Sequence, residues 1–181
     1  MGPNLLMVEY TEHTSKSPFI SGSYALSAGK YFNSLWGVRF ELSGAHDRAI
    51  HGFDNGISPK YHFNHFGLGA ELTMNFSNLF RSKDEQHDWN IELMAGPGLL
   101  HTYGFGGDAT TAKDNELNTD ARTYLTLYFG GAVSYKVSKD VHISLELMNN
   151  LLNDDFNGYV GDRGLEYQSN LLLGVRYYFG E

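Results

Sequence analysis

Seven charged side chains occupy the polar positions of segments that otherwise alternate between apolar and small or polar residues. They are three cations and four acids: Arg39, Glu41, Glu71, Glu92, Lys136, Glu146 and Arg176. Because side chains alternate across a strand, we expect all of them to point to one side of a sheet. Enclosed charges of both signs could pair into a network that plugs the interior, or they could line a narrow polar channel. The plug is favoured because an unpaired buried charge is costly.

Two further patterns resemble metal sites but fail on their spacing. Segment 153–158, Asn-Asp-Asp-Phe-Asn-Gly, resembles the start of a calcium loop, yet the position where an EF-hand needs its final acid is Gly164. His62 and His65 look like a ligand pair, but residues three apart on a strand face opposite sides. We therefore expect no metal site and no cofactor, with loose affinity of segment 153–158 for divalent cations as the alternative.

His101, Asp47 and Ser43 could be assembled into the rim site of a membrane-embedded lipid-modifying enzyme, which would pair a histidine with a serine or an acid. Nothing in their spacing requires this arrangement, and the chain has no nucleophile motif. The sequence therefore predicts a protein without catalytic residues that is not an enzyme, with the lipid-modifying enzyme as an alternative.

Composition narrows the classes of protein further. The 181 residues fit a single domain spanning 1–181, and the lack of cysteine excludes disulfides and thiolate chemistry. A net charge of −8 leaves no basic stripe for phosphates, so no nucleic-acid partner is expected. Aromatic residues make up 14% of the chain although its mean hydropathy is only −0.35, a combination that strict alternation produces.

Alternation with a period of two predicts eight strands. The clearest is the last, in which Leu171, Leu173 and Val175 alternate with polar or small residues, and the first is the weakest. The expected strands are 5–11, 19–32, 36–43, 66–76, 89–99, 124–136, 141–148 and 167–179. Pro97 cannot donate to a ladder, so we expect a bulge or a strand end there.

The expected connections alternate in length. Segments 30–35 and 138–140 are short, whereas 46–61, 104–121 and 149–164 are long, and 104–121 carries four acids and one lysine. Segment 77–88 is a fairly long connection at the short end. One end of the sheet should therefore carry turns and the other long, acidic loops.

The apolar face of the third to eighth expected strands carries no charge, and aromatic residues gather near the turn end. The aromatic girdle expected there contains Trp36, Phe76, Trp89, Tyr135, Tyr177 and Phe179. Apolar runs of about 9–11 residues match a tilted strand that crosses a bilayer. The fold class expected is therefore all-β: an eight-stranded antiparallel up-and-down transmembrane barrel. A soluble ligand-binding barrel or a sandwich stays open, because alternation alone does not exclude either.

Several short motifs resemble the OmpA-type eight-stranded outer-membrane barrels, in particular the form found in Bacteroidetes. They are Trp-Gly-Val-Arg-Phe at 36–40, Asn-Phe-Ser-Asn-Leu-Phe at 75–80, Ala-Gly-Pro-Gly at 95–98, 151–158, and the aromatic ending 175–180. The resemblance implies the outer membrane of a Gram-negative bacterium, a removed signal peptide and short turns in the periplasm. Many members continue into a peptidoglycan-binding domain, and that activity cannot be carried over to this chain.

The resemblance also implies a function. The expected role is structural or interactive: a porin-family membrane anchor that displays acidic extracellular loops over a plugged lumen. The expected partners are outer-membrane lipid, the outer-membrane assembly machinery, which would recognise the final alternating segment, and a protein bound by the loops.

Overall fold

The computed structural model describes residues 7–12, 20–50, 60–80, 88–108, 118–153, 156, 158 and 165–179. The elements there are the strands β1 (Met7–Glu12), β2 (Ile20–Tyr31), β3 (Trp36–Ile50), β4 (Lys60–Asn75), β5 (Trp89–Gly107), β6 (Arg122–Lys136), β7 (Val141–Asn153) and β8 (Leu165–Tyr177), and one short helix, α1 (Ser77–Phe80). Every strand pairing is antiparallel. The all-β antiparallel prediction is confirmed.

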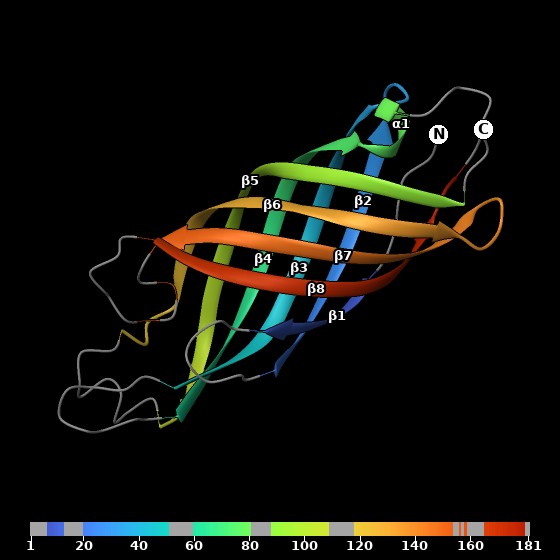
Figure 1. The fold of residues 1–181 in the computed structure, drawn as a ribbon. Helices are drawn as coiled ribbons and strands as arrows, with labels where there is room; N and C mark the ends of the chain where they lie inside the picture. Colours follow the sequence, from blue (N-terminus) through green and yellow to red (C-terminus); the bar gives the residue numbers. More distant parts are fainter. Residues whose placement is uncertain are drawn as a thin grey trace.

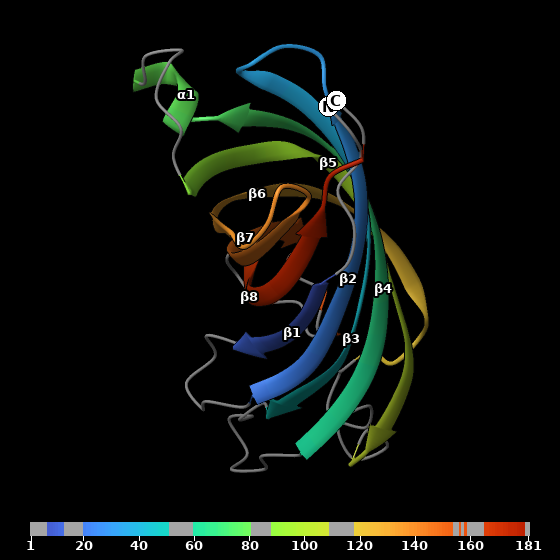
Figure 2. The same cartoon turned by 90° about the vertical axis from the view of Figure 1, so that its right-hand side faces the viewer.

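The strands pair in the order of the sequence, and β1 also pairs with β8, so the sheet closes on itself. In Figure 1, β6, β7 and β8 cross β2, β3 and β4, as opposite walls of a closed, twisted sheet do. Figure 2 shows β2, β3 and β4 together as one curved wall. A closed sheet has no edge strand to protect, because each strand has a neighbour on both sides.

The register fixes the stagger of this barrel. Following paired residues from Trp36 across each neighbouring strand in turn leads back to β3 at His46, ten residues further along. A stagger of this kind accompanies strands that are tilted by about 35–45° against the barrel axis. The interior of such an eight-stranded barrel is just wide enough to be filled by side chains.

Burial alternates along the strands with the period of two that the sequence shows. On β4, Leu68 and Leu72 are 46% and 48% exposed, whereas Glu71 and Thr73 are 2% and 5% exposed. The apolar side chains therefore point outward and the polar ones inward. This is the reverse of a water-soluble barrel, whose apolar residues fill the core.

The predicted loops 46–61, 104–121 and 149–164 are too long, because strands extend into all three. β3 continues to Ile50, β4 starts at Lys60, β5 continues to Gly107 and β7 to Asn153. Burial still alternates in these extensions, but the polarity changes: His46 faces out while Phe63 and Leu100 face in. Outward apolar residues, the signal used to predict strands, are missing there. Most of the remaining connections lie outside the described residues.

Pro97 does not end β5 or bulge it, which corrects the expectation. Its pairing with Leu127 of β6 continues in register on both sides. On the side that faces β4, Gly98 pairs with Gly69 and Ala95 pairs with Leu72. Pro97, which has no N–H to donate, falls between these two pairs. The register shift falls instead near His62 and Asn64, opposite Gly104, whose φ is +66°.

Side-chain caps organise the turn end of the barrel. The Asn33 side-chain oxygen accepts hydrogen bonds from the backbone N–H groups of Leu35 and Trp36. The Asn78 amide of α1 donates to the Ser34 carbonyl at 2.7 Å, which ties the helix to the β2–β3 turn beside it (Figure 1). Among the described residues, no helix is both long and apolar enough to cross a membrane.

Candidate functional site: the barrel interior and its two rims

Arg39 and Glu146 form the centre of the interior. Arg39 lies on β3 and Glu146 on β7, on opposite walls, and both face the lumen because of strand parity. The two terminal nitrogens of Arg39 donate to the two carboxylate oxygens of Glu146 at 2.8 and 2.7 Å. This bidentate geometry suits the planar guanidinium and fixes the distance between the walls.

Four more charged groups extend this pair. The Arg39 Nε donates to Glu71 at 2.8 Å, and the same guanidinium lies 3.1 Å from a carboxylate oxygen of Glu41. Arg176 bridges Glu92 and Glu146, with 3.1 Å to Glu146. All six residues are nearly inaccessible to solvent. We call Arg39, Glu41, Glu71, Glu92, Glu146 and Arg176 the lumen network; every member was named from the alternation.

Lys136 was expected in this network, but the structure places it outside. It is the last residue of β6 and is exposed, because its inward parity brings it to the open turn end, where no wall remains to cover it.

Just beyond β8, the Tyr178 ring lies 4.6 Å from the ring of His142. Burial and the charge of Glu92 raise the pKa of Tyr178 to about 12, so its hydroxyl stays protonated at neutral pH.

Glycines on β4 and β5 make room for one large ring inside the barrel. Tyr128 of β6 is fully buried, and a Cβ placed on Gly98 would lie 1.9 Å from its ring. A Cβ on Gly67 would meet its hydroxyl at 2.5 Å. Tyr128 also packs in an apolar cluster with Met94 and Met148. The lumen at this level is therefore filled by side chains.

The loop end of the interior is apolar, which the sequence did not predict. Its cluster consists of Tyr61, Phe63, Leu100, Tyr124, Leu152 and Phe156. Phe156 packs edge-on against Phe63 and Tyr124, with ring centroids 5.6 and 5.9 Å apart. Below this cap, the buried His65 Nδ1 and Asp47 Oδ2 are 2.5 Å apart. Extending the parity of Arg39 and Glu71 along their strands would have identified both residues as inward-facing.

The residues considered for a catalytic rim site do not come together. Asp47 faces inward and pairs with His65, whereas His101 lies on the outer face. There His101 makes a 2.8 Å hydrogen bond with the Thr123 hydroxyl and stacks on Tyr103. Ser43 points inward, away from His101. The three residues therefore form no constellation.

The two metal patterns are separated or lie beyond the described chain. His62 faces outward and His65 inward, as parity requires. Asp154, Asp155 and Asn157 of the calcium-like segment lie outside the described residues. Within the part of the chain that the structure describes, no three His, Asp or Glu side chains are grouped to hold a metal ion.

The six girdle residues lie at or near the turn end. Trp89 pairs across strands with Tyr135, their ring centroids 4.8 Å apart, and Tyr177 lies against Phe179 at 4.6 Å. Phe76 packs on Phe80 of α1 at 5.0 Å. Five of the six are exposed, and Phe76 is half-buried: Trp36, Trp89, Tyr135, Tyr177 and Phe179 are exposed large apolar residues.

A second set of aromatic side chains marks the loop end of the outer face and was not predicted. Tyr24, Phe66, Tyr103 and Tyr167 are all exposed there. Phe66 and Phe76 are ten residues apart, about 33 Å along a strand and about 25 Å along the axis at a tilt near 40°. That height matches the apolar band of outer-membrane barrels, about 25 Å.

The geometry agrees with solved structures of bacterial surface proteins. Neisserial surface protein A has a TM-score of 0.59 and 18% identity, with 98% of this chain and 96% of that chain covered. Ail of Yersinia pestis, in complex with the heparin analogue sucrose octasulfate, has a TM-score of 0.55 and 12% identity over 98% and 99%. The outer membrane protein Ail in a phospholipid bilayer nanodisc gives 0.50 and 15% over 99% and 100%.

No protein-family model matches the chain, and no curated protein matches its sequence. At these identities the likeness to solved structures shows a shared fold. The chain has the fold of outer-membrane β-barrel proteins.

Proposed function

We propose that this chain is an integral outer-membrane protein of a Gram-negative bacterium and spans the bilayer as an eight-stranded barrel. The observation that supports this most strongly is the inverted polarity of the sheet. Leucines such as Leu68 and Leu145 are about half exposed, whereas Glu71 and Glu146 are buried. Exposed leucines and buried glutamates are favourable together only when hydrocarbon surrounds the outer face of the sheet.

The barrel serves as an anchor that presents its long connections outside the cell. Turns such as 32–35 and 137–140 face the periplasm in this proposal, and the connections around 51–59, 109–117 and 154–164 face outward. Segment 104–121 carries four acids and one lysine. A polyanion of the kind bound in the Ail complex is therefore a poor ligand for this segment, and a basic protein surface is a better one.

The lumen is closed to solutes in this proposal. The lumen network crosses the barrel at Arg39 and Glu146, and the apolar cap lies above it at the loop end. Each guanidinium is shared by more than one carboxylate, so opening a path would require several buried ion pairs to separate.

Two measurements on the whole chain test the membrane assignment. Folded barrels resist SDS, so an unheated sample should migrate differently from a boiled one on a gel, and the protein should fractionate with outer membranes after export in a Gram-negative host. A chain that remains monomeric in buffer without detergent would contradict the proposal and favour a soluble barrel.

The orientation has its own test. An epitope tag inserted after Ala112 should be accessible to antibody on intact cells. The matched tag inserted after Lys139 should become accessible only after the outer membrane is permeabilised. The opposite pattern would reverse the assignment of loops and turns.

A further inference from the structure

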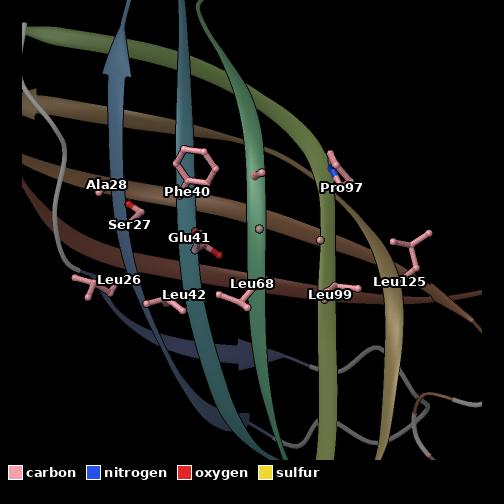
Figure 3. Close-up of a pocket in the computed structure, with 13 residues that line it drawn as sticks. Leu26, Ser27, Ala28, Phe40, Glu41, Leu42, Leu68, Pro97, Leu99 and Leu125 are labelled. Atoms are coloured by element: carbon pink, nitrogen blue, oxygen red, sulfur yellow. The ribbon is translucent and has the colours of Figure 1, made fainter.

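The outer face of β2 to β6 is built in rows of register-paired residues, which run obliquely to the barrel axis because the strands are tilted, and successive rows change in character toward the loop end. One row consists entirely of register-paired leucines: Leu26, Leu42, Leu68, Leu99 and Leu125. Figure 3 shows these five leucines side by side across the strands. Along this row, the five neighbouring strands all offer a leucine side chain.

An apolar groove runs along the turn side of this row. Ala28 and Pro97 line it with small side chains, and Phe40 lies beside them (Figure 3). Ala70 also lines the groove. The groove has a volume of about 690 Å³. Its lining is apolar except for Ser27 and Glu41, whose side chains are buried on the inner side of the wall. Branched and straight hydrocarbon can enter it without meeting an exposed polar side chain of the lining.

Toward the loop end, the same strands become aromatic and then polar. The next row pairs Tyr24 with Gly44, Gly44 with Phe66 and Phe66 with His101. The row after it contains His46, Asn64 and Tyr103. This order from leucine to aromatic to polar is the order in which a bilayer passes from hydrocarbon to headgroup.

A cationic patch follows beyond these rows: Arg48 and Lys60 supply its positive charge, and His46 and His62 add their imidazole rings. Arg48 lies directly opposite His62 across β3 and β4, and the rings of His46 and His62 are 5.1 Å apart. His46 Nδ1 is hydrogen-bonded to Asn64 Oδ1 at 2.8 Å.

In the part of the chain that the structure describes, the side chains of His46, Arg48 and Lys60 are exposed. His62 leans over Gly106, where a Cβ would lie 2.5 Å from its Nε2. Lys60 is exposed, and the Asp108 carboxylate accepts a hydrogen bond from the Lys60 backbone N–H at 3.2 Å. Arg48 and Lys60 therefore bring two positive charges beside one carboxylate, in a chain whose net charge is −8.

We infer that the groove and the cationic patch together bind one phosphate-bearing, anionic lipid of the surrounding leaflet. The phosphate lies against Arg48, Lys60 and the two imidazoles, and an acyl chain lies in the groove beside the leucine row. This site rests on the proposed membrane span, because only a span brings a headgroup to the patch and hydrocarbon to the groove.

Charge complementarity and continuity favour a lipid over other occupants. The patch and the groove share strands β3 and β4, and only the aromatic and polar rows of Phe66 and Asn64 separate them. A single lipid can therefore place its headgroup against the cationic patch and its acyl chain in the groove. Cations at this level attract anionic headgroups and hydrogen-bond phosphate oxygens.

Native mass spectrometry of the detergent-solubilised chain tests the site by titration with phosphatidylglycerol or phosphatidylcholine. Phosphatidylglycerol should bind first and more tightly. Replacing Lys60 by glutamine should weaken its binding about fivefold, and Arg48→Gln with Lys60→Gln at least about tenfold. Ala70→Phe, which fills the groove, should weaken the binding of both lipids.

Matched variants control for charge and bulk elsewhere on the outer face. Lys136→Gln removes a cation at the turn end, and Val133→Phe adds a ring outside the groove; both should leave binding unchanged. Equal affinity for the two lipids, or unchanged binding in the double variant, would overturn the site. So would displacement of the lipid by millimolar glycerol phosphate alone, which would indicate a site for free phosphate, or a dimer mass, which would indicate that a second copy covers the groove.

The failure of this site can be distinguished from the failure of the membrane assignment. A chain that shows heat-modifiable migration in vesicles but no preference for phosphatidylglycerol loses only the lipid site. A chain that does not insert into vesicles at all loses both.

Discussion

At the scale of single residues, the stability of the barrel depends on Glu146. It is the carboxylate that both arginines of the lumen network share, and it is fully buried. Its removal takes two hydrogen bonds from Arg39 and one from Arg176 in a place that water does not reach. Glu41, Glu71 and Glu92 remain beside the two arginines, so the cost is that of several charge-assisted hydrogen bonds lost at buried guanidinium groups.

Glu146→Ala should therefore lower the free energy of unfolding by about 3–5 kcal/mol. Urea unfolding in lipid vesicles, followed by the heat-modifiable gel band, measures this change. Lys136→Ala is the control, because Lys136 is exposed and should change stability by no more than about 0.5 kcal/mol. Equal effects of the two variants would show that the network contributes little.

Position 98 must be glycine because there is no space for a larger side chain. An added methyl group would overlap the buried ring of Tyr128 and approach the Leu68 carbonyl at 2.7 Å. Gly98→Ala should therefore destabilise the barrel by about 1–3 kcal/mol. Gly22→Ala is the control, since nothing lies within 4 Å of a Cβ there. The second change Tyr128→Leu should recover part of the loss; if it does not, the overlap with the ring is not the cause.

At the scale of elements, the proposed membrane span places each strand in two environments. On β4, Leu72 lies between the aromatic levels of Phe66 and Phe76, whereas Asn64 lies beyond Phe66 on the loop side. Both side chains point outward. A charge should therefore cost much at one position and little at the other, although the two share one strand and one face.

Leu72→Arg should cost about 2–4 kcal/mol and slow insertion, while Asn64→Arg should cost about 0–1 kcal/mol. Refolding into vesicles at a series of urea concentrations gives both values. If the two arginines cost the same, the change of environment along β4 is absent and the outer face is uniformly wet.

Alternation predicted the strand segments in which the outward side chains are apolar and the inward ones polar. It missed the segments near the loop end, where this difference in polarity between the two faces is lost. All six members of the lumen network were predicted from the alternation, and Lys136 was wrongly added, because its place at the strand end leaves it exposed despite its inward parity. Phe63 and Leu100 were missed as core because the expected strands began at Phe66 and ended at Leu99, so neither residue was given a direction. In the proposed membrane span, water surrounds the strands beyond the headgroup level, so the apolar side turns inward there as in a soluble protein. Only the three-dimensional register shows where that reversal occurs.

At the scale of the whole molecule, the interior determines what can pass through the barrel. The salt-bridged centre and the apolar cap lie one above the other along the axis. Planar-bilayer recordings of the wild-type chain should therefore show no large, steady conductance. Arg39→Ala with Glu146→Ala removes the central pair and should introduce brief openings. Large steady currents from the wild type would contradict a plugged lumen.

The direction in which the leucine rows face is the central claim, and the chain is well suited to test it because it has no cysteine. Single cysteines at Leu68, Leu72, Glu71 and Thr73 can carry a nitroxide in a reconstituted bilayer. Collision rates with dissolved oxygen and with a water-soluble nickel chelate then report the surroundings of each label. Labels at 68 and 72 should meet oxygen far more often than nickel, and labels at 71 and 73 should meet little of either. A higher nickel than oxygen signal at both leucine positions would contradict the account.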